Sequence, residues 1–293
     1  MTEAAWVQWH ALGGQVAARE PRSVVDPEAL ILVSLWLQDE EPRFRDMLSG
    51  FAGVGSRLLS VQRVRRLVDR FPSGGDTRVS VFARLVGSSP GDPRWRRLAG
   101  NGTAAPGRGG KVAAPALRLT RPAAMLLRLR TAFGVDVRTD VLAYLLGKGS
   151  ALIPIRDIAA DLGYAGNTVR GACEALADAR FITADPGRPA RYHASAGRWG
   201  PLLELPIMPT WNAWWQAYAM ALALRDWLRG EEARGASSAV RSIVARDWVH
   251  RHRAALAALR LEVPDPRDHQ GASFVPRFEK LVAAIADWFA RNA

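Results

Sequence analysis

Residues 137–195 constrain the fold of this chain more than any other stretch, because helical and extended patterns alternate there in a recognisable order. Apolar residues at helical spacing come first, followed by a short extended segment, a second helix, a tight turn and a third helix. Two short extended segments then follow, joined by a turn that is rich in glycine and proline. The order predicts three helices and a small β-hairpin.

The first two helices of this stretch are predicted from their apolar stripes and from the glycines that end them. Valine and leucine residues at 141–146 form one stripe, and Gly147 and Gly149 end that helix. An extended segment surrounds Pro154. The second helix is predicted over residues 157–162, and Gly163 stops it.

The third helix follows a tight turn at residues 164–166. Asn167 and Thr168 supply side-chain oxygens at its start, where free backbone N–H groups need acceptors. We expect one face to be buried, formed by Val169, Cys173, Leu176 and Ala177.

The β-hairpin is predicted to begin with a strand at residues 181–183 and to return with a strand at 191–193. The turn between them spans residues 185–189. Arg188 and Arg191 make the tip of the hairpin basic, which suits contact with a phosphate backbone.

The run DIAADLGYAGNTVRGACEALADARFI, followed by GRPARY, resembles the winged helix-turn-helix transcription regulators of the ArsR and MarR type. The resemblance covers about residues 120–200. It implies a repressor-like protein that binds double-stranded DNA, usually as a homodimer. Metal sensing in these families uses clustered cysteines and histidines. This chain departs from that pattern, since it has one cysteine and scattered histidines.

In the general motif the third helix enters the major groove with its N-terminal residues near the base edges. Arg170 is then a candidate for a guanine contact or a phosphate clamp. Asn167 either pairs with an adenine or caps the helix. Glu174 and Asp178 would repel phosphate, so they should point sideways or pair with arginines. The residues predicted to contact DNA are Asn167, Thr168, Arg170, Arg188 and Arg191.

The excess of basic residues is densest just before this stretch. The chain carries a formal net charge of +12, and residues 101–135 contain no acidic side chain. They form either a basic arm that adds phosphate contacts or a solvated linker. The basic residues are Arg108, Lys111, Arg118, Arg121, Arg128 and Arg130.

Residues 1–100 are predicted to form a helical N-terminal domain. Its helices are expected near residues 27–36, 44–51, 61–68 and 79–86, the first opened by Asp26 and Pro27 and the third capped by Ser60. Residues 41–71 are either a structural helix pair or a second helix-turn-helix. The arginines expected on the outward face of the third helix are Arg63, Arg65, Arg66 and Arg70.

The remaining segments complete the predicted organisation. Residues 101–119 read as a flexible basic linker, and residues 122–133 as a helix that packs on the central domain. Residues 201–293 are predicted to be a helical domain that holds most of the tryptophans. These rings either form a three-helix core or line a ligand pocket or a dimer interface. The expected fold is therefore mainly α, with a central winged helix-turn-helix between two helical domains.

Several kinds of chemistry have no signature in the sequence. Neither a dinucleotide-binding glycine pattern nor a GxxxxGK[ST] loop is present, so we predict no enzyme and no cofactor. His250 and His252 are two positions apart on a helix, which is poor geometry for a shared metal. No apolar run is long enough to span a membrane, and a single thiol fits a reducing cytoplasm.

The leading prediction is a cytoplasmic, dimeric, sequence-specific DNA-binding regulator, most simply a repressor. One alternative is a protein-interaction or antitoxin-like module of a defence operon, in which the winged helix is a scaffold or an autoregulator. Another is a ligand-gated sensor that uses the tryptophan-rich C-terminal helices.

Overall fold

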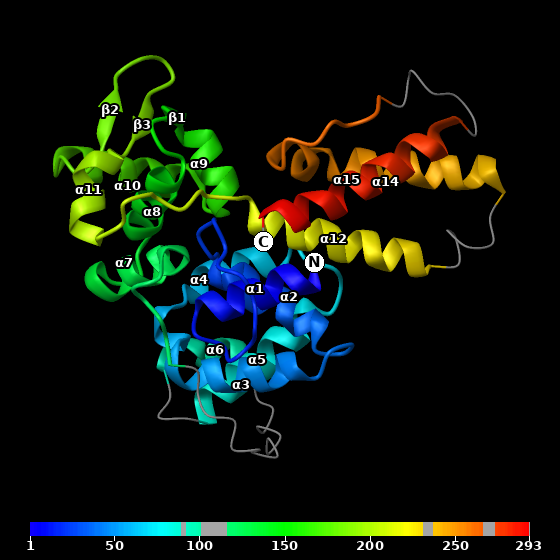
Figure 1. Cartoon of the computed structure of the whole chain (residues 1–293), viewed down its shortest axis with the longest axis horizontal. Helices are drawn as coiled ribbons and strands as arrows, with labels where there is room; N and C mark the ends of the chain where they lie inside the picture. The colour runs from blue at the N-terminus through cyan, green and yellow to red at the C-terminus, as the bar shows by residue number, and fades with distance from the viewer. Residues whose placement is uncertain (89–91, 101–115, 231–236, 266–272, 293) are drawn as a thin grey trace.

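A computed structural model describes residues 1–88, 92–100, 116–230, 237–265 and 273–292 (Figure 1). The described chain is mainly helical and contains a small three-stranded antiparallel sheet. The N-terminal elements are α1 (Thr2–Ala11), α2 (Pro27–Leu37), α3 (Arg43–Val54), η1 (Ser56–Leu58), α4 (Val61–Val68), α5 (Gly75–Ser88), η2 (Pro93–Trp95) and α6 (Arg96–Ala99).

The middle of the chain holds the sheet and the helices around it. These elements are η3 (Pro122–Ala124), α7 (Met125–Phe133), α8 (Val137–Gly147), β1 (Ile153–Pro154), α9 (Ile155–Leu162), α10 (Gly166–Asp178), β2 (Thr183–Asp185), β3 (Arg191–His193) and α11 (Ala196–Leu203). Strand β3 lies between the other two, and Tyr192 pairs with Ile153 of β1 and with Ala184 of β2. The C-terminal helices are α12 (Trp214–Arg229), α14 (Ser238–Ala258) and α15 (Phe274–Asn292).

Helix α2 lies at the centre of the molecule, and all 11 of its residues are buried. Its start is set by Asp26, whose side chain accepts a hydrogen bond from the Ala29 N–H (3.1 Å), and by Pro27 in the first turn. A helix that is apolar on every side has to be enclosed by other elements. Helices α1, α3, α4 and α5 contact it, and so does α12 from the other end of the chain.

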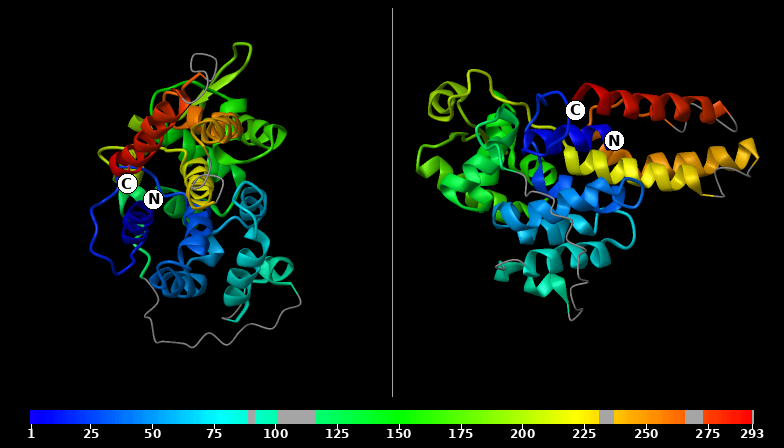
Figure 2. Two further views of the ribbon diagram at one scale, coloured as in Figure 1. Left: turned by 90° about the vertical axis from the view of Figure 1, so that its right-hand side faces the viewer. Right: turned by 60° about the horizontal axis from the view of Figure 1, so that its bottom comes forward.

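The N-terminal and C-terminal helices therefore share one hydrophobic core, whereas residues 1–100 and 201–293 were predicted to form separate domains. Trp214 of α12 stacks on Tyr218 and meets Trp288 of α15 edge to face. Its indole N–H donates to the Ser23 hydroxyl (3.2 Å) of the segment before α2. Both ends of the chain lie at this junction (Figure 2).

A second core belongs to the middle of the chain, from α7 to Trp211. Cys173 is fully buried in it, as predicted, and burial raises the pKa of its thiol to about 12. The thiol therefore stays protonated near neutral pH. Most tryptophans of the C-terminal half are also buried in the two cores, which agrees with the structural reading of these rings.

The hairpin starts two residues later than predicted. Strand β2 begins at Thr183, and Phe181, which was predicted to lie in this strand, precedes it and is exposed. The cause is the end of α10, where Arg180 adopts a positive φ of 59° and the Phe181 N–H returns to the Leu176 carbonyl (2.9 Å). The Phe181 ring instead packs edge to face on Trp199.

Among the described residues, no helix is both long enough and apolar enough to cross a membrane.

Candidate nucleic-acid interface

The turn between α9 and α10 is held tightly against the N-terminal helices. Gly163 ends α9 in the left-handed conformation (φ 73°, ψ 24°), which favours glycine. A Cβ at this position would also lie 2.7 Å from a methyl carbon of Leu67 in α4. The left-handed backbone conformation, and to a lesser degree the nearby Leu67 side chain, therefore favour glycine where the chain turns into α10.

Helix α10 presents one buried and one exposed face. Val169, Ala172, Cys173 and Leu176 are buried, while Asn167 and Arg170 are exposed and Thr168 is half-buried. The helix begins at Gly166, and its N-cap residue, Ala165, has no side chain that can cap it. The Asn167 side-chain oxygen accepts from the neighbouring Thr168 N–H (2.9 Å), so part of its amide is engaged locally.

The hairpin places two further predicted residues beside α10. Arg188 lies in the exposed loop between β2 and β3, and Arg191 is exposed on β3. Burial raises the pKa of the neighbouring Tyr192, and the positive charge of Arg170 opposes that shift. Tyr192 of β3 and Cys173 of α10 are buried in the same hydrophobic core, so the strand that carries Arg191 lies near α10.

No carboxylate in the described part of the chain pairs with Arg170, Arg188 or Arg191. Glu174 and Asp178 are exposed on α10. Neither has an arginine partner among the described residues, so the second of the two predicted alternatives, pairing with arginines, is not found there.

A buried ion network lies where α2, α4, α7, α8 and the α9–α10 turn meet. Arg63 and Arg130 are fully buried, as are the carboxylates that surround them. Buried charges are stable only when they are paired and hydrogen-bonded. The network consists of Asp26, Glu28, Ser60, Arg63, Arg130, Asp140 and Tyr164.

Arg63 connects α4 to the start of α2 and to α9. Its guanidinium donates to both Asp26 oxygens (2.5 and 2.6 Å) and to Glu28 (2.7 Å). Its Nε–H donates to the Leu162 carbonyl at the end of α9 (2.7 Å). The prediction that Arg63 faces outward is wrong, because it lies four residues before Leu67 and shares the buried face of α4.

Arg130 extends the network into the middle of the chain. It donates to both oxygens of Glu28 (2.5 and 3.2 Å) and to both oxygens of Asp140 in α8 (2.8 Å each). The Tyr164 hydroxyl, in the turn before α10, donates to Asp140 (2.7 Å). The network thus fixes the turn that positions α10 relative to the N-terminal helices.

Three side chains of the predicted basic arm are engaged within the protein, while Arg118 is exposed. Besides the buried Arg130, Arg121 donates to the His10 carbonyl (2.8 Å) and Arg128 to the Leu203 carbonyl (2.6 Å). The proposal that these side chains contact phosphate as a free arm is therefore wrong for them. Arg108 and Lys111, with most of the predicted linker, lie outside the described residues.

We expect the free energy of unfolding to decrease as the pH falls below the ordinary glutamate pKa of 4.5. Burial alone raises the pKa of Glu28, but Arg130 and Arg63 outweigh it and lower the pKa. Since the folded protein then binds this proton less readily than the unfolded chain, protonation favours unfolding. The stabilisation is complete above pH 4.5 and is lost as the pH falls through the lowered pKa.

Urea unfolding between pH 3 and 7 would measure this loss. In Glu28→Gln the dependence should be shallower, while Glu41→Gln, at an exposed pair with Arg43, should behave like the unmodified protein. If the free energy of unfolding of Glu28→Gln depends on pH as steeply as that of the unmodified protein, Glu28 is not the source of the pH dependence.

Comparison of the chain with protein-family models, with curated proteins and with solved structures finds no match. No group of three or more potential ligands (His, Cys, Asp or Glu) suited to a metal ion is found among the described residues. We therefore infer the function from the geometry of α10 and the hairpin.

Proposed function

We propose that residues 120–200 form a winged helix-turn-helix domain and that the protein is a sequence-specific DNA-binding transcriptional regulator acting as a repressor. The observation that carries the proposal is that Arg170 is exposed on α10, without a carboxylate partner among the described residues, and near a hairpin that bears Arg188 and Arg191 (Figure 1). The order of α8, β1, α9, α10, β2 and β3 and the short α9–α10 turn support it.

In this proposal the N-terminal half of α10 enters the major groove. Arg170 contacts a guanine, and Asn167 and Thr168 lie near the adjacent bases. Arg188 and Arg191 bind phosphate or reach the minor groove. A dimer would present two copies of α10 to a palindromic site.

The proposal is tested by binding of the protein to the DNA upstream of its own gene and to a scrambled fragment across a salt series. A preference for the native fragment that survives moderate salt supports a sequence-reading regulator. Equal binding that disappears steeply with salt would mean that the arginines supply only phosphate attraction, and would contradict the proposal.

Arg170→Ala should weaken binding to the native fragment by about 10-fold or more, because a bidentate base contact is worth about 1–3 kcal/mol. Binding to scrambled DNA should change less. Fluorescence anisotropy measures both affinities. Arg277→Ala, an exposed arginine of α15, removes the same charge away from α10 and is the matched control. Unchanged sequence preference in Arg170→Ala would refute the role of this residue.

The double variant Arg188→Ala/Arg191→Ala should weaken binding to both fragments to a similar degree. If each arginine neutralises one phosphate, the slope of log K against log salt should decrease in magnitude by about 2. An unchanged slope would show that the hairpin does not contact the DNA backbone.

A protein-interaction module is the second candidate function. It is favoured by exposed apolar side chains on α7, α11 and the segments that follow α10 and α11. These side chains are Phe133, Phe181, Leu202 and Ile207. Loss of sequence preference in the DNA experiment, together with complex formation with another protein of the same operon, would select this alternative.

A further inference from the structure

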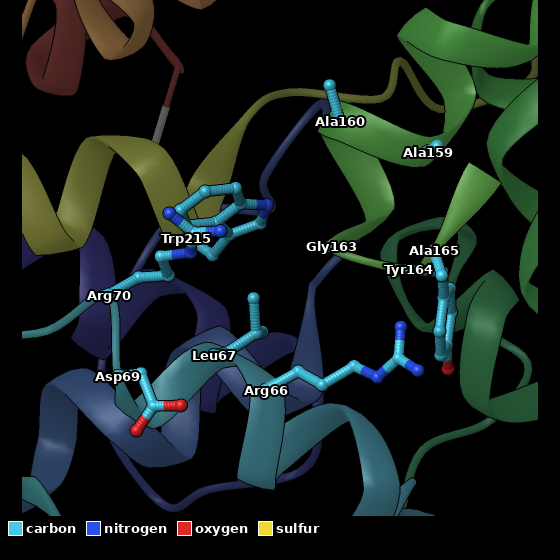
Figure 3. A pocket seen from close by; sticks show the side chains of 10 residues that line it. All are labelled: Arg66, Leu67, Asp69, Arg70, Ala159, Ala160, Gly163, Tyr164, Ala165 and Trp215. Atoms are coloured by element: carbon cyan, nitrogen blue, oxygen red, sulfur yellow. The ribbon is translucent and has the colours of Figure 1, made fainter.

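Tyr164 occupies the short turn that joins α9 to α10, one residue before Ala165, the N-cap residue of α10. Figure 3 shows this turn at the edge of a pocket of about 650 Å³, where Tyr164 and Ala165 lie across from Arg66 and Leu67 of α4. Tyr164 is 7% exposed and belongs to the core of the middle of the chain. Its side chain therefore offers almost no surface to DNA.

The Tyr164 hydroxyl connects this turn to the buried ion network. It donates a hydrogen bond to the Asp140 carboxylate of α8 (2.7 Å), and the hydroxyl of Ser60, before α4, lies 3.3 Å away. Burial and the negative charge of Asp140 raise the pKa of Tyr164, so the hydroxyl keeps its proton and stays a donor. A hydrogen bond to a carboxylate is stronger than one between neutral groups. The turn is therefore anchored to α8.

The residues proposed to contact bases follow Tyr164 closely in the chain. Asn167, Thr168 and Arg170 lie three, four and six positions after it, near the start of α10. The buried side chains farther along α10 hold the middle of the helix in its core. Tyr164 holds the end of the helix from which the base contacts would be made.

We propose that Tyr164 is a positioning residue, whose hydrogen bond to Asp140 fixes the N-terminal end of α10 in the orientation needed to read bases. The consequence for DNA rests on the proposed function, whereas the anchoring of α10 does not. A bidentate base contact needs its side chain placed within about 0.5 Å, while the attraction of arginines to phosphate is independent of sequence. Loss of this hydrogen bond therefore lowers sequence preference more than overall DNA affinity.

The same hydrogen bond makes the reading of bases depend on helices outside residues 120–200. Asp140 also pairs with Arg130 (2.8 Å), and Arg130 pairs with Glu28 of α2 (2.5 Å). The backbone N–H of Ser60 donates to the same glutamate (2.7 Å). The N-terminal helices therefore complete the site that holds the Tyr164 hydroxyl.

Tyr164→Phe removes the hydroxyl and keeps the ring. Fluorescence anisotropy with the native and the scrambled fragment should show the ratio of the two affinities reduced by about 10-fold. The salt dependence of binding to the scrambled fragment should stay the same, because no phosphate contact is lost. A purely structural role would leave the ratio unchanged in the folded variant.

Tyr144→Phe is the matched control for this experiment. Tyr144 is also buried, and its hydroxyl also donates to a carboxylate, that of Asp161 (2.9 Å), but this bond joins α8 to α9. The control should keep the full preference for the native fragment. The inference is overturned if Tyr164→Phe keeps that preference, or if Tyr144→Phe loses as much of it.

Hydrogen–deuterium exchange of the free protein tests the anchoring without DNA. Backbone N–H groups of residues 169–172 should exchange about 10-fold faster in Tyr164→Phe, because losing a hydrogen bond to a charged group makes local opening easier. In Tyr144→Phe they should exchange at the unmodified rate. If the unmodified protein shows no preference between the two fragments, the proposed function fails, and exchange alone decides the anchoring. Unchanged exchange in Tyr164→Phe would refute it.

Discussion

Replacing Arg63 with alanine is expected to lower the free energy of unfolding by about 3–5 kcal/mol. The substitution removes four hydrogen bonds that the Arg63 side chain donates. It leaves Arg130 as the remaining cation of the network beside three buried carboxylates, those of Asp26, Glu28 and Asp140. An uncompensated buried charge is costly because the carboxylate has lost its hydrating water and no longer receives the hydrogen bonds of Arg63 in its place. Urea unfolding followed by circular dichroism measures the effect.

The neighbouring Arg65 provides the control for this experiment. It is exposed on the same helix, so Arg65→Ala should change stability by no more than about 0.5 kcal/mol. If both variants unfold at the same urea concentration, Arg63 is not a structural part of the network. A loss in Arg63→Ala of less than about 1 kcal/mol would have the same meaning.

Replacing Trp214 with alanine is expected to cost about 3–5 kcal/mol, in the range of other buried aromatic residues. The ring contacts Tyr218, Trp288 and Phe289, and its N–H is bonded to Ser23. It therefore joins the segment before α2 to α12 and α15. Calorimetric unfolding should show one transition at a lower temperature, because the two ends of the chain share one core.

Ile243→Ala, at a position 58% exposed on α14, is the control and should change stability by about 0.5 kcal/mol or less. Two separate transitions in Trp214→Ala, with the N-terminal helices unaffected, would show that residues 1–100 and 201–293 are independent domains after all.

Local patterns predicted the elements from α8 to β3 well. The apolar stripes of α9 and α10 and the stop at Gly163 are properties of neighbouring residues, and the structure places helices at those positions. The start of β2 was missed by two residues because the end of α10, not strand propensity, determines where Phe181 lies. The DNA-contacting roles of the exposed residues stay predictions.

The buried ion network was not predicted, because its pairs are distant in the sequence. Arg63 meets Asp26 across 37 positions, and Arg130 meets Glu28 across 102. Two local signals were nevertheless present. Glu28 stands in the otherwise apolar run of α2, and Arg63 shares a helical face with Leu67. A charged residue within an apolar pattern indicates a buried partner elsewhere in the chain.

The core shared by the N-terminal and C-terminal helices also had a signal in the sequence. Helix α2 is almost entirely apolar, so other helices had to enclose it on every side. Which helix completes the enclosure depends on tertiary packing, and the sequence pattern of α12 does not identify its partner.

Packing of α12 and α15 against the first helices has a consequence for the order of folding during synthesis. Helices α1 and α2 leave the ribosome well before α12 and α15, which cover part of their surface. At typical elongation rates the interval is on the order of 10 s. During that time an apolar helix such as α2 would be a ready target for chaperones. Meanwhile the segment from α7 to Trp211 has its own core and can form earlier.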